Sequence, residues 1–452
     1  MRPPWQSHPI STSLAGKAAV AAAAATACVL GLAVPATAAV SAVPATWTPQ
    51  LASTGTTQQV RQLVQCGGTM YAVGTFTSIK RYSTTYARNN AFSFSATTGV
   101  LTSWDPNVNG TVNSIALSAD CATAYLGGKF TSVHGTAVNN IASLSTSTGV
   151  VNTGFRHSAN GQVEALLVSG SHLLTGGYFT GINGSTRRYM VSLNPSTGVD
   201  DGYVNLNISG NYVYTDAAGR QSVANATRVY NYALSPSRTK LLVMGDFTSV
   251  GGLGRRQMFM LNLGATSTSV DAWYSPEFDA NCAVSEPFWL QDAAWSPDGS
   301  EIYIATTGYK PANGVGYNII GPRGGLCDAA AAYSSASVST QAHLWINYTG
   351  CDSLYSAAAD TNTVYIGGHE RWASNDHQCD NNNDGSAINA PGMAGLSPTT
   401  GRVVFNPTRS RGLGADDMVV TSAGLWIASD NYGGSSQCAG QWGHAGICFL
   451  PY

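Results

Sequence analysis

Acidic side chains gather in long segments of the second half of the chain. Glu286 precedes Pro287-Phe288-Trp289, and a carboxyl group beside apolar rings gains a raised pKa that suits a general acid. Glu370 follows a strand-like stretch, and Asp416 and Asp417 stand together before another. Two such carboxylates within about 5 to 9.5 Å of each other could hydrolyse a glycosidic bond. These four residues are therefore the candidate catalytic groups.

Ring-bearing side chains occur in the same segments as these carboxylates. We expect the flat rings of Trp372, Tyr432 and Trp442 to stack on sugar rings, with His369 beside them as a polar contact. The alternative is structural: aspartates commonly cap turns, and tryptophans fill the spaces between packed sheets. Both interpretations stay open at the level of the sequence.

The segment 380–385 matches the first half of a calcium-binding loop. Asp380, Asn382 and Asp384 occupy the first, third and fifth positions, and Gly385 permits the sharp turn that follows. Position twelve is Pro391, so the usual bidentate glutamate is missing. Ca²⁺ is the candidate cofactor, and the alternative is a solvated polar loop held by Cys379. No cysteine or histidine spacing typical of zinc occurs, and no nucleophile elbow is present.

Internal repeats identify the elements that must position these groups. A Gly-Gly-x-Phe-Thr-x-Val motif recurs with small variations, and weaker copies follow in the second half of the chain. Together they make seven units with a period of roughly 50 to 60 residues, which is typical of propeller blades with insertions. The sequence predicts an all-β fold, a seven-bladed β-propeller of four-stranded antiparallel blades. The clear copies of the motif are 73–79, 127–133, 176–182 and 244–250.

One unit illustrates the expected blade. The segments 112–117, 123–130, 141–144 and 150–155 alternate with turns and read as four consecutive strands. Gly127-Gly128 lies inside the second strand, where glycine usually marks a close approach of another backbone. Such a sheet cannot bury both of its faces alone, but radial stacking buries them and limits exposed edges.

The long connections of the later units are predicted to share one face. In a four-stranded blade, the loop between strands two and three and the loop to the next blade open on the same side. Long ordered loops on a rigid scaffold are where binding and catalysis concentrate. We therefore expect a ligand-binding face formed by the connections 211–228, 271–288, 309–325, 371–391 and 431–446.

The repeats resemble the delta-60-type β-propeller repeats of secreted actinobacterial proteins. The resemblance is carried by the Gly-Gly-x-Phe-Thr-x-Val motif and the Thr-Gly-Val turns, as at 148–150. Three later strings add to it: 345–350, 365–372 and 424–426. The resemblance covers most of the chain after residue 38 and implies a propeller fold, without implying a particular activity. Glu370 departs from the glutamine expected in such proteins.

The N-terminal 38 residues read as a signal peptide. A nearly unbroken apolar run, 18–34, is followed by Ala36-Thr37-Ala38, an Ala-x-Ala cleavage site. We expect residues 39–452 to form a single β-propeller domain that is secreted, extracellular and monomeric. The formal net charge is only −2, and no basic stripe occurs, so neither nucleic acid nor a membrane is an expected partner.

The cysteines beyond the signal peptide are predicted to form disulfides. An even number of cysteines in an exported chain is typical of a disulfide framework, although many connectivities are possible. Similar positions in adjacent units favour a bridge between Cys66 and Cys121. The other expected pairs are Cys282 with Cys327, Cys351 with Cys379, and Cys438 with Cys448.

Two functional hypotheses follow, and a purely structural role is the third. The first is a secreted propeller that binds an extracellular carbohydrate or cell-surface polymer through the long-loop face. The second is a glycoside hydrolase or polysaccharide lyase that uses aspartate and glutamate on the same face. A carboxylate pair at one deep pocket would favour the enzyme, and a shallow aromatic surface would favour binding.

Overall fold

A computed structural model describes most of the chain after the predicted signal peptide, which lies outside the described residues. The described residues belong to one compact unit, Thr37–Tyr452. They are residues 39–215, 221–224, 226–280, 282, 288–308, 326–376, 379–380, 382–407, 412, 414–432 and 445–452.

The described residues confirm the all-β prediction. Apart from a single 3-10 turn, η1 (Pro276–Asp279), their regular structure consists of strands, and the sheets are antiparallel. None of the helical structure in this part of the chain is long and apolar enough to cross a membrane.

The first three main sheets each contain three strands. They are β2 (Gln59–Cys66), β3 (Thr69–Thr75) and β6 (Ala91–Ser95); β7 (Thr111–Leu117), β8 (Thr123–Lys129) and β11 (Ile141–Ser145); and β12 (Val163–Ser169), β13 (His172–Gly177) and β14 (Met190–Leu193).

The next three main sheets each contain four strands, and the last contains three. They are β18 (Arg228–Leu234), β19 (Lys240–Asp246), β22 (Met258–Leu263) and β23 (Thr268–Val270); β24 (Leu290–Trp295), β25 (Glu301–Thr306), β26 (Ala329–Ser334) and β27 (His343–Tyr348); β28 (Leu354–Ala359), β29 (Val364–Gly368), β32 (Met393–Leu396) and β33 (Val403–Phe405); and β34 (Asp417–Thr421), β35 (Gly424–Ala428) and β36 (Ile447–Pro451).

Short strands form small separate sheets within the connections between the main strands. They are β1 (Gln50–Leu51), β4 (Ser78–Arg81) and β5 (Thr84–Ala87); β9 (Ser132–Val133) and β10 (Thr136–Ala137); β15 (Ile208–Ser209), β20 (Ser249–Val250) and β21 (Leu253–Gly254); β16 (Tyr212–Thr215) and β17 (Gln221–Ala224); and β30 (Trp372–Ala373) and β31 (Ile388–Asn389).

The predicted fourth strand is wrong for the first three sheets, where only an isolated bridge forms. In the unit analysed above, Leu144 pairs with Val151 at a single position. The chain then turns away because Asn152 bonds Ser143 twice, through its backbone N–H and through its side-chain amide. A capped turn therefore replaces the outer strand.

The described N-terminal segment is hydrogen-bonded to the edge strand of the last sheet. The Ser41 and Ala45 N–H groups donate to the carbonyls of Pro451 and Phe449 in β36, at 2.7 and 2.9 Å. Val40 is buried in the apolar cluster of that sheet. Backbone hydrogen bonds thus join the two ends of the described chain.

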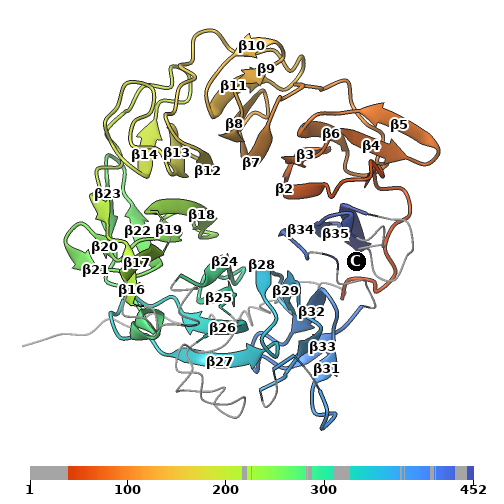
Figure 1. Cartoon of the computed structure of the whole chain (residues 1–452), viewed down its shortest axis with the longest axis vertical. Helices are drawn as coiled ribbons and strands as arrows, with labels where there is room; N and C mark the ends of the chain where they lie inside the picture. The colour runs from red at the N-terminus through yellow and green to blue at the C-terminus, as the bar shows by residue number, and fades with distance from the viewer. Residues whose placement is uncertain are drawn as a thin grey trace, which may run out of the picture. The chain divides into compact units, whose positions relative to one another are not determined.

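The main sheets follow one another in chain order around one centre, with the first strand of each innermost (Figure 1). Each of these first strands contacts the first strand of the next sheet, from β2 through β7, β12, β18, β24 and β28 to β34. β34 in turn contacts β2.

Packing explains the phenylalanines and the glycines of the repeated motif. Its phenylalanines, such as Phe76 and Phe130, are almost fully buried. A Cβ atom on Gly128 would lie 2.1 Å from the Thr111 carbonyl oxygen, and one on Gly74 would lie 2.1 Å from that of Gln59. The predicted close backbone approach at these glycines is therefore confirmed.

Three of the predicted disulfides are confirmed. Cys66 pairs with Cys121, Cys282 with Cys327 and Cys351 with Cys379, with Cα–Cα distances of 5.9, 5.6 and 5.0 Å. Cys448 is disulfide-bonded, while Cys438 lies outside the described residues. The Cys66–Cys121 bridge links the first sheet to the second, as its place in the repeat suggested.

Candidate functional site

A β-bulge near the start of the innermost strand recurs in six of the main sheets. In β2 the pairing with β3 shifts between Val60 and Gln62, so that Arg61 has no partner. The same shift leaves one extra residue in β7, β12, β18, β24 and β28. A bulge re-aims the side chain of the extra residue. Just before β34, Asp416 follows the buried Ala415, as each extra residue follows a buried apolar one.

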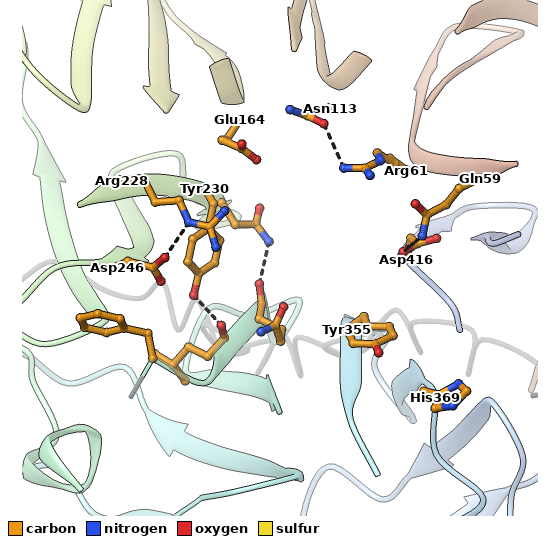
Figure 2. Close-up of a pocket in the computed structure, with 14 residues that line it drawn as sticks. Gln59, Arg61, Asn113, Glu164, Arg228, Tyr230, Asp246, Tyr355, His369 and Asp416 are labelled. Atoms are coloured by element: carbon orange, nitrogen blue, oxygen red, sulfur yellow. Dashed lines mark hydrogen bonds and ion pairs between the residues drawn. The ribbon is translucent and has the colours of Figure 1, made fainter. Parts of the chain in front are cut away.

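The seven residues at this position all line one cavity of about 700 Å³. We call them the bulge layer, and Figure 2 shows several of them around the cavity. Their polar groups include two carboxyls, two amides, two phenols and one guanidinium. The members of the bulge layer are Arg61, Asn113, Glu164, Tyr230, Gln291, Tyr355 and Asp416.

The next residue along each strand belongs to what we call the link layer. Its side chains mostly bond the neighbouring first strand: the Gln62 carbonyl accepts from Ile115 N–H at 2.7 Å, and the Ser114 hydroxyl accepts from Leu166 N–H at 3.0 Å. The members of the link layer are Gln62, Ser114, Ala165, Asn231, Asp292, Ser356 and Asp417, and most of them line a smaller cavity of about 280 Å³ that shares residues with the larger one.

Arg228 forms one wall of the larger cavity and is tightly held. Its Nε donates to Asp246 Oδ2 at 2.7 Å, and its guanidinium lies over the rings of Tyr178 and Tyr230, at 5.0 and 4.9 Å from their centroids. Tyr230 in turn donates to the Leu290 carbonyl oxygen. An arginine with a partner on each side is a fixed part of the wall.

Arg61 lies on another wall and has few partners. Its side chain is exposed to the cavity, and its NH1 donates to Asn113 Oδ1 at 3.0 Å. Figure 2 shows Arg61 near Gln59 and Asp416, away from the Arg228–Asp246 pair. None of the ion pairs among the described residues involves Arg61.

Asp416 is a buried carboxyl group at the edge of the cavity. Its Oδ1 accepts from the Gln59 side-chain amide at 2.7 Å, while its Oδ2 has no hydrogen-bond partner among the described residues. Burial raises the pKa of Asp416 well above its ordinary value, and the nearby charge of Asp430 acts in the same direction. Burial therefore disfavours the charged form of Asp416, while the Gln59 hydrogen bond and the positive charge of Arg61 act in the opposite direction.

Two further carboxyls of the cavity also have raised pKa values. Burial raises the pKa of Glu164, partly opposed by the positive charges of Arg228 and Arg61. Burial likewise raises the pKa of Asp246, opposed by the charge and hydrogen bond of Arg228. The cavity thus contains carboxyl groups whose pKa values are higher than those of free side chains.

Of the four predicted catalytic residues, the three that the structure describes lie in different places. Asp416 lines the larger cavity, and Asp417 belongs to the link layer, where its Oδ2 accepts from Leu63 N–H at 2.8 Å. Glu370 is fully buried and lines neither cavity. Glu286 lies outside the described residues. Of the three predicted catalytic residues that the structure describes, Asp416 is the one that lines the larger cavity.

The predicted binding residues are also separated. His369 lines the larger cavity. Trp372 lies in the short strand β30, with the Arg371 guanidinium 4.5 Å above its ring, and Tyr432 is exposed; neither lines either cavity. Trp442 lies outside the described residues.

The predicted calcium loop is held by its own hydrogen bonds. Asp380 Oδ1 accepts from Arg371 NH2 at 2.6 Å, and Asn382 Oδ1 accepts from Ala387 N–H at 3.0 Å. Asp384 Oδ1 accepts from both donors of Ser386. No group of three or more acidic, histidine or cysteine side chains that could hold a metal occurs in the part of the chain described. These hydrogen bonds describe how the loop is held, and calcium stays a prediction.

Sequence reasoning missed most of the bulge layer, together with Gln59, Arg228 and Asp246. Its members share no residue type, so a search for one chemical motif passes over them. The available signal was positional: each follows a buried valine, leucine or alanine near the start of the first strand in its repeat, as in Val60-Arg61, Val112-Asn113 and Val163-Glu164.

Comparisons with known proteins bear on the fold alone. The chain matches no protein-family model, and a search of curated proteins finds no match. Among solved structures, it is similar to that of U3-55K, with a TM-score of 0.50 and 10% identity over 90% of this chain and 100% of that one. It is also similar to hydrazine synthase of Kuenenia stuttgartiensis, with a TM-score of 0.47 and 12% identity over 82% of this chain and 92% of that one.

Proposed function

We propose that the chain is a secreted, seven-bladed β-propeller that binds an extracellular carbohydrate in its axial cavity. The propeller is supported by the recurring motif, the successive contacts from β2 to β34, the contact of β34 with β2, and the pairing of Ser41 and Ala45 with β36. Disulfides are typical of proteins in oxidising compartments and support export.

The observation that carries the carbohydrate proposal is the bulge layer. It brings one polar side chain from each innermost strand to a single cavity of about 700 Å³, a volume that suits a small ligand or one end of a longer one. Sugar hydroxyls need many donors and acceptors at fixed positions, and the layer offers amides, phenols, carboxyls and a guanidinium. Tyr355 and Phe288 add ring surface to the lining.

The directions of the strands support a ligand face at the end of the sheets where the bulges lie. The bulges lie at the N-terminal ends of the first strands, and pairing in register places the C-terminal end of β3 and the start of β6 at that same end. The tight turns, such as Gly401-Arg402, lie at the opposite end of the sheets. The described connection from β3 to β6 therefore begins and ends at the same end of its sheet as the bulge.

A second candidate function is glycoside cleavage in the same cavity. It is favoured by Asp416, whose raised pKa favours the protonated form that a general acid needs, and by Glu164, a second carboxyl of the lining. The enzyme would place the acid on Asp416 and the second carboxyl on Glu164, rather than on the adjacent pair Asp416 and Asp417.

The test is a binding screen of residues 39–452 on plant, fungal and bacterial oligosaccharides, followed by titration calorimetry of the best ligand. We expect Glu164→Gln and Tyr355→Ala to weaken binding by about tenfold or more, because each loses a direct contact worth at least about 1.4 kcal/mol. Arg402→Ala, an exposed change at the opposite face, is the control and leaves binding unchanged.

Release of reducing ends or unsaturated products in the same assay separates the two candidate functions. Product release that disappears in Asp416→Asn supports cleavage, and binding without product supports recognition alone. A ligand whose affinity is the same in the cavity variants and in the wild type would contradict both, as would a screen without any bound carbohydrate.

A further inference from the structure

We propose that the carbohydrate bound in the axial cavity carries a carboxylate, as a uronic acid does, and that Arg61 is the residue that binds it. This inference rests on the proposed carbohydrate function and deepens it by naming the class of sugar. The two arginines of the cavity have different surroundings, and so do the carboxyl groups near them.

The first step is that only one of the two cavity arginines has its charge matched by the protein. Arg228 is paired with Asp246 at 2.7 Å and packed against two tyrosine rings. Arg61 has a single hydrogen bond, to the neutral Asn113 amide, and no carboxylate within ion-pair distance among the described residues. Its other guanidinium N–H groups are available to a ligand in the cavity.

The second step is that Arg61 is positioned rather than left to move as a surface arginine would. The bulge in β2 directs its side chain into the cavity, and the bond from NH1 to Asn113 Oδ1 fixes one edge of the guanidinium. A planar guanidinium held on one edge presents the remaining donors in the geometry that a carboxylate accepts.

The third step concerns the carboxyl groups that share the cavity. The Asp416 side chain is held by the Gln59 amide and has an Oδ2 atom without a hydrogen-bond partner in the described part of the chain. Asp416 forms no ion pair with Arg61 among the described residues, and burial raises its pKa and so disfavours its charged form. The positive charge of Arg61 is therefore left for an external anion.

The fourth step is that the opposite charge lies elsewhere in the same lining. Glu164 belongs to β12 and Arg61 to β2, with Asn113 of β7 between them in the order of the sheets. A cavity with a cation at one position and an acceptor carboxyl at another suits a ligand that has both an anionic group and hydroxyl donors. A uronic acid residue combines these two features in one ring.

The experiment compares uronate oligosaccharides with their methyl esters, which keep the sugar and remove the charge. The probes are tetramers of galacturonate, glucuronate and mannuronate, each in acid and ester form, with the matching neutral tetramers and a sulfated neutral tetramer. For at least one uronate we expect the acid to bind about tenfold or more tightly than its ester at pH 7, since a charge-assisted hydrogen bond is lost in the ester.

Two substitutions assign the preference to Arg61. In Arg61→Met the acid and ester should bind with equal affinity, while Arg402→Met, a matched exposed change at the opposite face, should keep the full preference. Arg61 is exposed, so the variant is expected to fold, and an unchanged melting temperature verifies this. Asn113→Ala, which removes the residue holding the guanidinium, should reduce the preference less than Arg61→Met does.

The outcomes distinguish the uronate assignment from the proposed carbohydrate binding on which it rests. Neutral tetramers or methyl esters that bind as tightly as the acids would overturn the uronate assignment and leave carbohydrate binding standing. Preference for the sulfated tetramer alone would overturn the carboxylate and retain an anion site. An acid preference that survives Arg61→Met would overturn the role of Arg61, and failure of every probe to bind would overturn both proposals.

Discussion

The bulge layer and the link layer lie one residue apart along the same strands, and they differ in how fully their side chains line the larger cavity: every member of the bulge layer lines it, whereas Asn231 is the one member of the link layer that does. Asp416 and Asp417 make the contrast sharpest: Asp416 lines the larger cavity and has an unbonded oxygen, whereas Asp417 accepts from the Leu63 backbone of the first sheet. Gln291 and Asp292 repeat the contrast, because Gln291 lines the larger cavity while Asp292 bonds residues of both neighbouring strands.

Each innermost strand therefore contributes one residue to the proposed binding cavity and the next residue to contacts between sheets. The bulge leaves the first of the two residues out of the ladder, so its side chain is free to vary among repeats. The second residue returns to register and reaches the next sheet. Substitutions in the two layers should therefore separate binding from stability.

The largest effect on stability is expected in the link layer. Asp292 accepts from the Asn231 amide at 2.8 Å and from Ala357 N–H at 2.9 Å, so Asp292→Ala removes one acceptor from each neighbouring strand and leaves the Ala357 N–H without this partner. We expect a loss of about 2 to 4 kcal/mol in the free energy of unfolding. Urea unfolding measures it, with Gln291→Ala as the adjacent control. A loss below about 0.5 kcal/mol would show that the link layer does not hold the sheets together.

A second effect is a pH dependence of stability to which the link layer contributes. Burial raises the pKa of Asp292 to about 6 and, together with the charge of Asp292, that of Asp417 to about 7. The folded protein then holds these protons more tightly than the unfolded chain does. The free energy of unfolding should fall as pH rises from about 4 to about 7, by up to about 1.4 kcal/mol per pH unit for each group.

Thermal melts between pH 4 and pH 8 in wild type and in Asp417→Asn test this dependence. The amide cannot titrate and its oxygen still accepts from Leu63 N–H, so the slope should be shallower in the variant. Equal slopes in the two proteins would mean that Asp417 does not contribute to the pH dependence.

The smallest effect on stability is expected in the bulge layer. The Gln291 side chain lines the larger cavity, and its replacement removes no contact between sheets. We expect Gln291→Ala to change the free energy of unfolding by less than about 0.5 kcal/mol, as surface substitutions usually do, while ligand affinity measured by calorimetry falls. A loss of stability as large as that of Asp292→Ala would erase the distinction between the two layers.

The repeated parts of the molecule were predictable from the sequence. The recurring motif indicated antiparallel sheets of similar construction, and its glycines indicated a close backbone approach, which Gly74 and Gly128 confirm. Equivalent positions in neighbouring repeats indicated the Cys66–Cys121 bridge. These features depend on local spacing, so the order of residues along the chain is enough to reveal them.

The candidate site was only partly predictable, because its members are distant in sequence and unlike in chemistry. Asp416 and His369 were identified from their positions beside predicted loops, and both line the cavity. Glu370 was identified by the same argument, but its side chain is fully buried. Position near a strand end indicates which residues can reach a shared face, and it does not indicate which way each side chain points.

By itself, therefore, the sequence determined the all-β repeat architecture and three of its crosslinks. The tertiary structure alone decided which polar residues meet. A shift of one residue in register turns a side chain from one surface of a strand to the other, and the bulges introduce that shift in six innermost strands. Asp416 and Asp417 are identical, adjacent residues in the chain. Only the geometry of β34 beside β2 places Asp416 against the larger cavity and Asp417 against the Leu63 backbone.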